Sequence, residues 1–359
     1  MSHIFVGMSG GVDSSVAAAL CQEQGYQVTG VYMKNWTLDV GGAECPWRQD
    51  LADAQSVAAQ LDIPLKIFDF ETEYKDRVVD YMLDEYRAGR TPNPDIMCNQ
   101  EVKFKLFFET ALEEGADAIA MGHYARARDG RLYAGVDTQK DQSYFLHRLK
   151  SDVLARTIFP LGGYSKDAVR KRAAERDLPT ASKPDSQGIC FIGEVDIKTF
   201  LADYIETEPG PIKHYTTGAV LGEHAGAAFY TIGQRHGLHV GGALSNSNHG
   251  GLPLYVLSKD MAENTVYVTE NLTALMEDTF TIGDTHWINE PPRTTGDAYY
   301  VRTRHGGRLT PATVDNVDEQ TAEIRLAQPE RALTAGQFAV VYQDAPEGLR
   351  VAGGGIIRA

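Results

Sequence analysis

Short apolar runs alternate with amphipathic segments along residues 1–122. The apolar runs are bounded by turn residues and predict strands at 3–8, 27–33, 65–70 and 117–122. The intervening segments predict helices at about 13–24, 47–61, 72–88 and 101–114. This alternation is typical of a parallel sheet covered by helices on both faces. Ligands of such sheets bind beyond the carboxyl ends of the strands. We therefore expect the functional residues in the turns at 9–14, 33–36 and 122–124.

The pattern changes further along the chain. Residues 126–136 predict a hairpin, and residues 165–177 predict a basic amphipathic helix. From about residue 200 glycine is frequent and alternating runs such as 265–269 and 339–342 predict β structure. We predict an α/β N-terminal domain with a parallel, helix-covered sheet, then a small central domain and a C-terminal β-barrel-like domain. The expected divisions are 1–200, 201–275 and 276–359.

The first turn has the chemistry of an anion site. Ser-Gly-Gly-Val-Asp-Ser at 9–14 lies between the first strand and an alanine-rich helix. Backbone N–H groups at such a helix start favour a phosphate, and the glycines at 10 and 11 permit its close approach. The chain lacks Gly-Lys-Ser/Thr here, which excludes the Walker type of phosphate loop. Alternatively, this is an ordinary glycine turn with Asp13 in a first helical turn, where acids are favoured.

Composition narrows the class of protein. The 359 residues are 43% hydrophobic and 23% charged, which is ordinary for a globular protein of two or three domains. No apolar run is long enough to cross a bilayer, and we expect a cytoplasmic, monomeric protein. The net charge of −15 disfavours nucleic-acid binding overall. Local basic clusters such as 166–176 and 302–308 could still bind phosphates, so the charge does not exclude a nucleic-acid partner.

The four cysteines show no metal-site spacing. Cys21 is expected in the core of the first helix, and Cys45 in an exposed, inert loop. Cys98 and Cys190 lie in the two most unusual predicted loops and are the candidates for thiol chemistry. In the first of these, prolines 92 and 94 flank Asn93 and predict a rigid, extended or turned platform for Asp95 and Cys98.

The loop at 9–14 resembles the pyrophosphate loop of N-type ATP pyrophosphatases, which cleave ATP between the α- and β-phosphates. The resemblance implies an adenine nucleotide alpha-hydrolase-like fold, with ATP and Mg²⁺ as cofactors. It also implies that Ser9, Gly10, Gly11 and Ser14 hold pyrophosphate, and that Asp13 binds Mg²⁺ or orients the loop. No protein cluster is expected to hold a metal by itself. The full set of implied ATP-binding positions is Gly7, Met8, Ser9, Gly10, Gly11, Val12, Asp13, Ser14, Met33 and Gly122.

At the segment 89–99, with Lys103 and Phe104 following, the chain closely resembles the tRNA-specific 2-thiouridylases, which thiolate the wobble uridine of certain tRNAs. The likeness extends through 33–36, 121–126, 140–146, 182–192, 230–238, 336–342 and 353–357. It implies adenylation of the C2 oxygen of uracil, then sulfur transfer from a cysteine persulfide with release of AMP. Cys190 would carry the persulfide, loaded by a sulfur carrier protein, and Cys98 would be the partner thiol. Asp95 would be the acid/base group, and Lys183 a source of positive charge near the thiols.

The same resemblance implies contacts with the target base and with tRNA. A uridine in an anticodon loop must leave its stack to be read. The positions implied are Asn93, Pro94, Asp95, His123, Lys140, Asp141, Gln142, Arg302, Thr303 and Gln337. His123 equally fits a buried core histidine, and Gln337 a turn residue.

Three alternatives remain at this point. A pyrophosphate-loop synthetase forming amides needs no paired cysteines. Another tRNA modifier of the superfamily, of the lysidine or 4-thiouridine type, shares the loop. A non-catalytic tRNA-binding protein would bind tRNA without forming AMP.

Overall fold

The computed structural model describes residues 1–40, 45–185, 197–238, 253–293 and 298–358. Its N-terminal part is built on a parallel sheet of strand order β3-β2-β1-β4-β7. The strands are β1 (His3–Gly7), β2 (Gln27–Lys34), β3 (Leu65–Asp69), β4 (Ala118–Ala120) and β7 (Thr157–Ile158). The four strands predicted from the apolar runs are confirmed.

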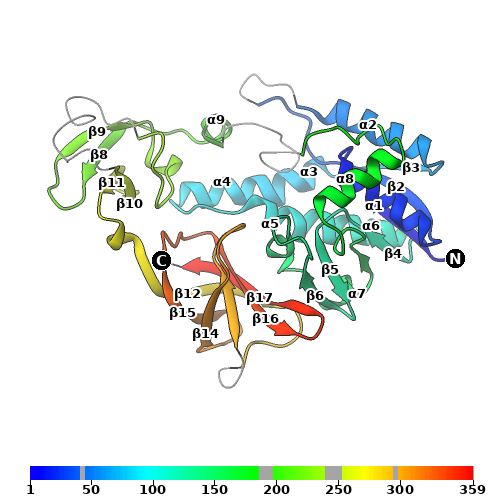
Figure 1. Ribbon diagram of the computed structural model, residues 1–359. Coiled ribbons are helices and arrows are strands. Elements are labelled where there is room, and N and C mark those ends of the chain that lie inside the picture. Colours follow the sequence, from blue (N-terminus) through cyan, green and yellow to red (C-terminus); the bar gives the residue numbers. More distant parts are fainter. Residues whose placement is uncertain (41–44, 186–196, 239–252, 294–297, 359) are drawn as a thin grey trace.

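Helices cover both faces of this sheet (Figure 1). One face carries α1 (Val12–Glu23), α2 (Trp47–Gln60) and α8 (Lys166–Glu175). The other carries two long, interrupted helices and the short α7 (Ser151–Ala155). The first runs through α3 (Glu71–Tyr74), η1 (Lys75–Val79) and α4 (Asp80–Arg87). The second runs through α5 (Pro94–Cys98), η2 (Asn99–Leu106) and α6 (Phe107–Glu113).

The second interrupted helix corrects the sequence prediction. Residues 91–99 were expected to form an extended platform, with a helix from 101. The helix instead begins at Pro94, because the Asn93 side chain accepts a hydrogen bond from the Ile96 N–H at 3.3 Å and caps it. Proline suits the first helical position, where no N–H bond is needed. Only Thr91–Asn93 precede the helix, and Cys98 is its last residue.

The central part is a small, separate sheet of order β10-β11-β8-β9 with its own apolar core. Its strands are β8 (Gly210–His214), β9 (Val220–His224), β10 (Tyr255–Asp260) and β11 (Thr265–Thr269). Helix α9 (Ile197–Ala202) precedes it and packs Phe200 against Trp36 of the N-terminal part. In Figure 1 this sheet lies beyond the end of α4, away from the parallel sheet.

The C-terminal strands close into a barrel. The order β12-β15-β14-β13-β16-β17 returns to β12, which pairs with both β15 and β17. The strands are β12 (Met276–Trp287), β13 (Tyr299–Arg302), β14 (Thr310–Asp315), β15 (Thr321–Arg331), β16 (Phe338–Ala345) and β17 (Gly348–Arg358). The predicted barrel-like domain is therefore confirmed.

The barrel is joined to the N-terminal part by main chain and by side chains. The predicted hairpin, β5 (Ala125–Arg128) and β6 (Arg131–Ala134), pairs its Tyr133 and Leu132 with β17. Phe338, Val340 and Tyr342 of β16 lie in the same apolar core as α5 and η2. The buried Asp141 carboxylate also accepts a hydrogen bond from Arg302 of the barrel at 3.0 Å. The barrel is thus held rigidly against the helix that carries Cys98.

We predict that Asp141→Asn lowers the free energy of unfolding by about 3–5 kcal/mol, because it leaves the buried Arg302 guanidinium without its counter-charge. Asp344→Asn is the matched control, since Asp344 is exposed and bonds only Tyr300 among the described residues. Urea unfolding of both variants measures the difference. Equal destabilisation by the two substitutions contradicts the assignment.

Candidate functional site

The loop after β1 is shaped by hydroxyl groups and one glycine. The Ser14 Oγ accepts from the Ser9 N–H at 3.2 Å and donates to the Gly11 carbonyl at 3.0 Å. Gly10 has a φ of +73°, and a Cβ there would lie 2.2 Å from the Asp50 carbonyl oxygen. Among the described residues no side chain caps the start of α1 at Gly11. Its first N–H groups therefore remain available to an anion.

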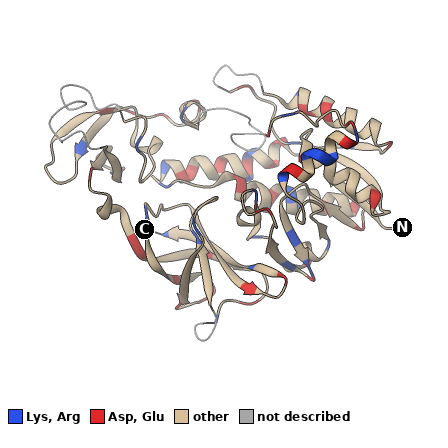
Figure 2. Ribbon diagram, in the orientation of Figure 1, with Lys and Arg blue, Asp and Glu red and all other residues tan. Residues whose placement is uncertain are grey.

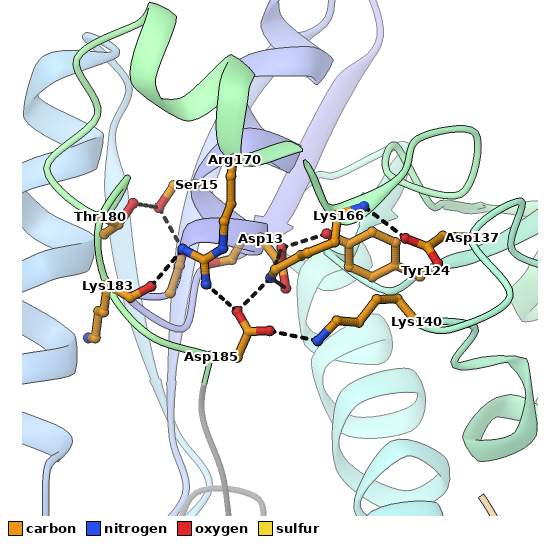
Figure 3. Close-up of polar contacts among 12 residues, drawn as sticks. Asp13, Ser15, Tyr124, Asp137, Lys140, Lys166, Arg170, Thr180, Lys183 and Asp185 are labelled. Atoms are coloured by element: carbon orange, nitrogen blue, oxygen red, sulfur yellow. Dashed lines mark hydrogen bonds and ion pairs between the residues drawn. The ribbon is translucent and has the colours of Figure 1, made fainter. Parts of the chain in front are cut away.

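An ionic cluster surrounds this helix start (Figure 3). The Lys166 Nζ lies 2.8 Å from both carboxylate oxygens of Asp13 and 2.7 Å from Asp185. Asp13 also accepts a hydrogen bond from the Tyr124 hydroxyl at 2.8 Å. Asp185 in turn contacts Arg170 at 2.7 Å and Lys140 at 2.8 Å. The first turn of α1 is thus tied to three later segments of the chain.

Lys183 connects the loop to α2. Its Nζ donates to the Gly10 carbonyl at 3.0 Å and contacts Asp50 at 2.8 Å and Asp53 at 2.5 Å. Burial alone would lower the pKa of Lys183, but the two carboxylates outweigh it and raise the pKa. Partial burial alone would raise the pKa of Asp185, whereas Lys140 and Lys166 lower it to about 2. Lys183 and Asp185 are therefore charged near neutral pH.

The predicted nucleotide positions lie together around the end of β1. A Cβ on Gly7 would meet the Met121 sulfur at 2.6 Å and the Met33 methyl at 3.1 Å, so the two methionines converge over this glycine. A Cβ on Gly122 would lie 3.0 Å from the Asp13 carbonyl carbon and the Ser14 nitrogen. The Met8 and Val12 side chains, in contrast, belong to the core beneath α1, so only their backbone borders the loop.

Cys98 lies on the opposite face of the sheet from α1. Its side chain is fully buried in the core that includes Ile96 and Val102. Asp95, one helical turn earlier on α5, is partly exposed and on the same side of the helix. Cys190 lies outside the described residues, so its distance from Cys98 stays untested. Lys183, expected near the thiols, donates to the Gly10 carbonyl of the Ser9–Ser14 loop, and its distance from Cys190 is likewise untested.

The other two cysteines are both core residues. Cys21 of α1 is completely buried, as predicted. Cys45 was predicted to be exposed, which is wrong, because its side chain is 5% exposed and packs in the core with Trp36 and Val40. Its Sγ donates to the Trp36 carbonyl at 3.6 Å.

Gln337 connects the barrel to the segment before α5. Its Nε2 donates to the carbonyls of Thr91 and Pro92 at 3.0 and 3.1 Å. The neighbouring Gly336 has a φ of +92° and packs directly on the Thr91 backbone. Gln337 and Thr303 also line a cavity of about 210 Å³ that reaches Thr231 of the central part. Gln337 therefore holds Thr91 and Pro92, the two residues directly before Asn93.

Several predicted tRNA contacts are engaged within the protein. Asp141 accepts from the Gly135 and Ser143 N–H groups and from Arg302, and its side chain is 3% exposed. Gln142 accepts from the Tyr124 N–H at 3.0 Å. Lys140 is half-exposed but paired with Asp185. In this conformation Asp141 and Gln142 position the chain rather than face solvent.

His123 is buried between aromatic rings. Its ring centroid lies 5.6 Å from that of Phe104 and 6.1 Å from that of Phe159. Burial, assisted by the positive charge of Lys103, holds its pKa well below the usual value. Among the described residues its Nδ1 has no hydrogen-bond partner. The imidazole is therefore neutral and retains capacity to bond a ligand.

Sequence reasoning missed the cations that complete the loop. Lys166 and Arg170 were read as part of a basic helix face, yet both point to the start of α1. Their spacing of four residues indicated a shared face. Nothing in the sequence indicated that this face packs on α1. Thr180, whose hydroxyl donates to Ser15 at 2.9 Å, was missed for the same reason.

The described residues show neither a ready-made metal site nor a membrane-spanning helix. Within the ranges that the structure describes, no group of three or more His, Cys, Asp and Glu side chains could hold a metal ion. No helix in those ranges is long and apolar enough to cross a membrane.

Known proteins resemble this chain over nearly its whole length. Three family models match it: a tRNA methyl transferase HUP domain at 2–194, a tRNA methyl transferase PRC-barrel domain at 198–270 and an aminomethyltransferase beta-barrel domain at 277–357. A tRNA-specific 2-thiouridylase MnmA of Nitrosomonas europaea is 46% identical, with 99% of this chain and 98% of the relative covered. That of Proteus mirabilis is 47% identical over 99% and 96%.

These similarities define a HUP-domain, tRNA-modifying class of protein. Within that class, the chain belongs to the tRNA-specific 2-thiouridylase family. Among solved structures, a 4-thiouridine synthetase–RNA complex with bound ATP covers 54% of this chain and 46% of its own, at 20% identity and a TM-score of 0.35.

We predict that Gly10→Ala lowers the affinity for ATP by about 100-fold or more, since the new methyl group collides with the Asp50 carbonyl. Gly25→Ala is the control, because Gly25 has a similar φ of +83° but open space around it. Calorimetric titration with ATP measures both. Equal affinities of the two variants for ATP contradict the proposal that the Ser9–Ser14 loop binds its phosphates.

We predict that His123 stays neutral on acidification. Its Cε1–Hε1 NMR signal should not titrate between about pH 5 and about pH 8, where an exposed histidine does. Because the folded-state pKa is depressed, the unfolded chain binds the extra proton, and stability falls as the pH drops below about 6.5. A His123 signal that titrates near that pH contradicts the buried geometry.

Proposed function

We propose that this protein catalyses the ATP-dependent 2-thiolation of the wobble uridine of tRNA, as a tRNA-uridine 2-sulfurtransferase. The observation that carries the proposal is the uncapped, glycine-shaped start of α1 with cations around it, in a chain of the 2-thiouridylase family. Such a helix start binds phosphate, and the fold presents it at the carboxyl edge of the sheet. The named relatives support sulfur transfer over methyl transfer.

The first half of the reaction activates the base. The uracil C2 oxygen attacks the α-phosphorus of ATP, and the bond to the β-phosphate breaks with release of pyrophosphate. The loop at Ser9–Ser14 would hold the leaving pyrophosphate through its N–H groups. The Gly7, Met33 and Gly122 positions would border the adenosine. Asp13 would hold Mg²⁺ bound with ATP only after exchanging its Lys166 contacts for the ion, which would neutralise phosphate charge.

The second half exchanges oxygen for sulfur. The terminal sulfur of a Cys190 persulfide attacks C2, and the C2–O bond breaks so that AMP departs with the former carbonyl oxygen. The Cys98 thiolate then attacks the Cys190 sulfur, which leaves sulfur on C2 and a Cys98–Cys190 disulfide. In the variant route Cys98 first frees sulfide from the persulfide, with the same disulfide as product. Asp95, which lies one helical turn before Cys98 on α5, would be the acid/base group of this sulfur transfer.

The target base would enter beside α5. Asn93, Pro94 and Asp95 stand at the start of this helix, held by Gln337 of the barrel. His123 would offer its unbonded Nδ1 to the base, and Thr303 lines the cavity that Gln337 also borders. Lys140, which contacts Asp185, and Arg302, which contacts Asp141, would contact the RNA elsewhere. Asp141 and Gln142 would act by positioning these neighbours. We infer that the barrel contacts the RNA, that the protein works as a monomer, and that a carrier protein supplies the persulfide.

Unthiolated tRNA incubated with the protein, Mg-ATP and a persulfide donor should yield 2-thiouridine and an equal amount of AMP. Cys98→Ser and Cys190→Ser should lower thiouridine formation by about 100-fold or more, because each removes a sulfur that the transfer uses. Cys21→Ser is the control, since this thiol belongs to α1 and packs in the core on the opposite face of the sheet from Cys98. Nucleoside mass spectrometry and AMP quantification give the result.

The outcomes separate the alternatives. AMP formed on tRNA addition without any sulfur product would favour another modifier of the superfamily. Tight tRNA binding without AMP would favour the non-catalytic alternative. Full activity of both cysteine variants would exclude the persulfide route.

A further inference from the structure

The cations beside the loop are fully neutralised by the protein itself. Lys140, Lys166, Arg170 and Lys183 are contacted by four carboxylates, those of Asp13, Asp50, Asp53 and Asp185. Figure 2 shows the basic α8 among acidic residues at this place, in a chain that is acidic overall. A polyanion that enters this cluster must therefore displace a carboxylate before it gains the cations.

The four carboxylates differ in how they are held. Asp50 and Asp53 are fixed on α2, and both contact the same Lys183. Asp13 lies in the first turn of α1 and has a second donor, the Tyr124 hydroxyl. Asp185 lies outside any helix or strand, and within the described residues its side-chain contacts are with cations. Of the four, Asp185 is the one whose departure disturbs no helix.

Asp185 also has the partners that a phosphate group prefers. One of its oxygens contacts both Lys166 and Arg170 at 2.7 Å, and the other contacts Lys140 at 2.8 Å. Lys166 is 10% exposed and also binds Asp13, so this carboxylate and the first turn of α1 share one ammonium group. Three cations around one anion is the arrangement used for phosphate recognition.

We propose that Asp185 occupies a phosphate subsite formed by Lys140, Lys166 and Arg170, and that the β- and γ-phosphates of ATP, or released pyrophosphate, displace it. This inference rests on the proposed use of ATP. It assigns Lys166 and Arg170 to phosphate binding beyond the loop, and it makes Asp185 an internal competitor. Nucleotide binding is then an exchange of anions, which keeps the buried Lys166 and its two neighbouring cations paired at every stage.

Calorimetric titration with magnesium pyrophosphate tests this directly. Asp185→Asn keeps the size of the side chain but removes its charge, so pyrophosphate affinity should rise about tenfold. Arg170→Gln removes a cation of the subsite, and affinity should fall about tenfold or more. Lys171→Gln is the matched control on the same helix, because Lys171 is 77% exposed and contacts only Glu175 among the described residues. Its affinity should equal that of the wild type.

An unchanged or weaker pyrophosphate affinity of Asp185→Asn overturns the proposal, as does wild-type affinity of Arg170→Gln. If Asp185→Asn fails to fold, Lys140→Gln replaces it, since Lys140 is half-exposed and its loss should weaken pyrophosphate binding several-fold. Wild-type thiolation of tRNA is assayed in parallel. If the wild type thiolates tRNA but these substitutions leave the pyrophosphate affinity unchanged, only the competitor role of Asp185 is refuted. If the wild type binds no pyrophosphate, the proposed function is refuted.

Discussion

The ammonium group of Lys166 is the contact on which the arrangement of the candidate site depends. It joins Asp13 in the first turn of α1 to Asp185, which lies 172 residues later in the chain by their numbers. The side chain is almost buried, so each of its two ion pairs is sheltered from solvent screening. Through this contact, helix α8 is placed over the phosphate loop, and the loop is closed on one side by later segments of the chain.

A second set of contacts fixes the barrel on the other face of the sheet. The Arg302–Asp141 pair, the pairing of β17 with the β5–β6 hairpin and the Gln337 side chain all connect the barrel to the N-terminal part. These contacts hold Asn93–Asp95 at a defined place relative to the sheet. The proposed phosphate site and the proposed base site are therefore on elements that are packed against each other, which suits a reaction in which one substrate activates the other.

Much of this architecture was predictable from local patterns. Strands β1, β2 and β4 are mostly buried on both faces, so they read as nearly continuous apolar runs, and the Ser9–Ser14 loop follows the first of them. The edge strand β3 is only partly buried, yet its apolar residues were still enough to predict it. The start of α5 was predicted too late in the chain, because prolines 92 and 94 were treated as residues that prevent a helix. Proline at the first helical position, preceded by the Asn93 cap, instead favours the start of a helix. The exposed location expected for Cys45 failed because burial of a loop depends on tertiary contacts.

The partners of the charged residues were beyond prediction from the sequence. Lys166 with Asp13, and Arg302 with Asp141, are separated by more than 150 residues, and no local pattern encodes such pairs. The types of these residues indicated only a basic helix at 166–176 and a basic cluster at 302–308. Which cations bind an acid and which face solvent follows from how α8 packs on α1 and how the barrel docks.

The central claim is that the uracil oxygen itself attacks ATP, and an isotope experiment tests it most directly. The tRNA substrate would carry ¹⁸O at C2 of the wobble uridine, and the released AMP would be analysed by mass spectrometry. The account predicts that one ¹⁸O appears in AMP for each 2-thiouridine formed. Unlabelled AMP alongside 2-thiouridine would contradict it, because the base would then have lost its oxygen without being adenylated.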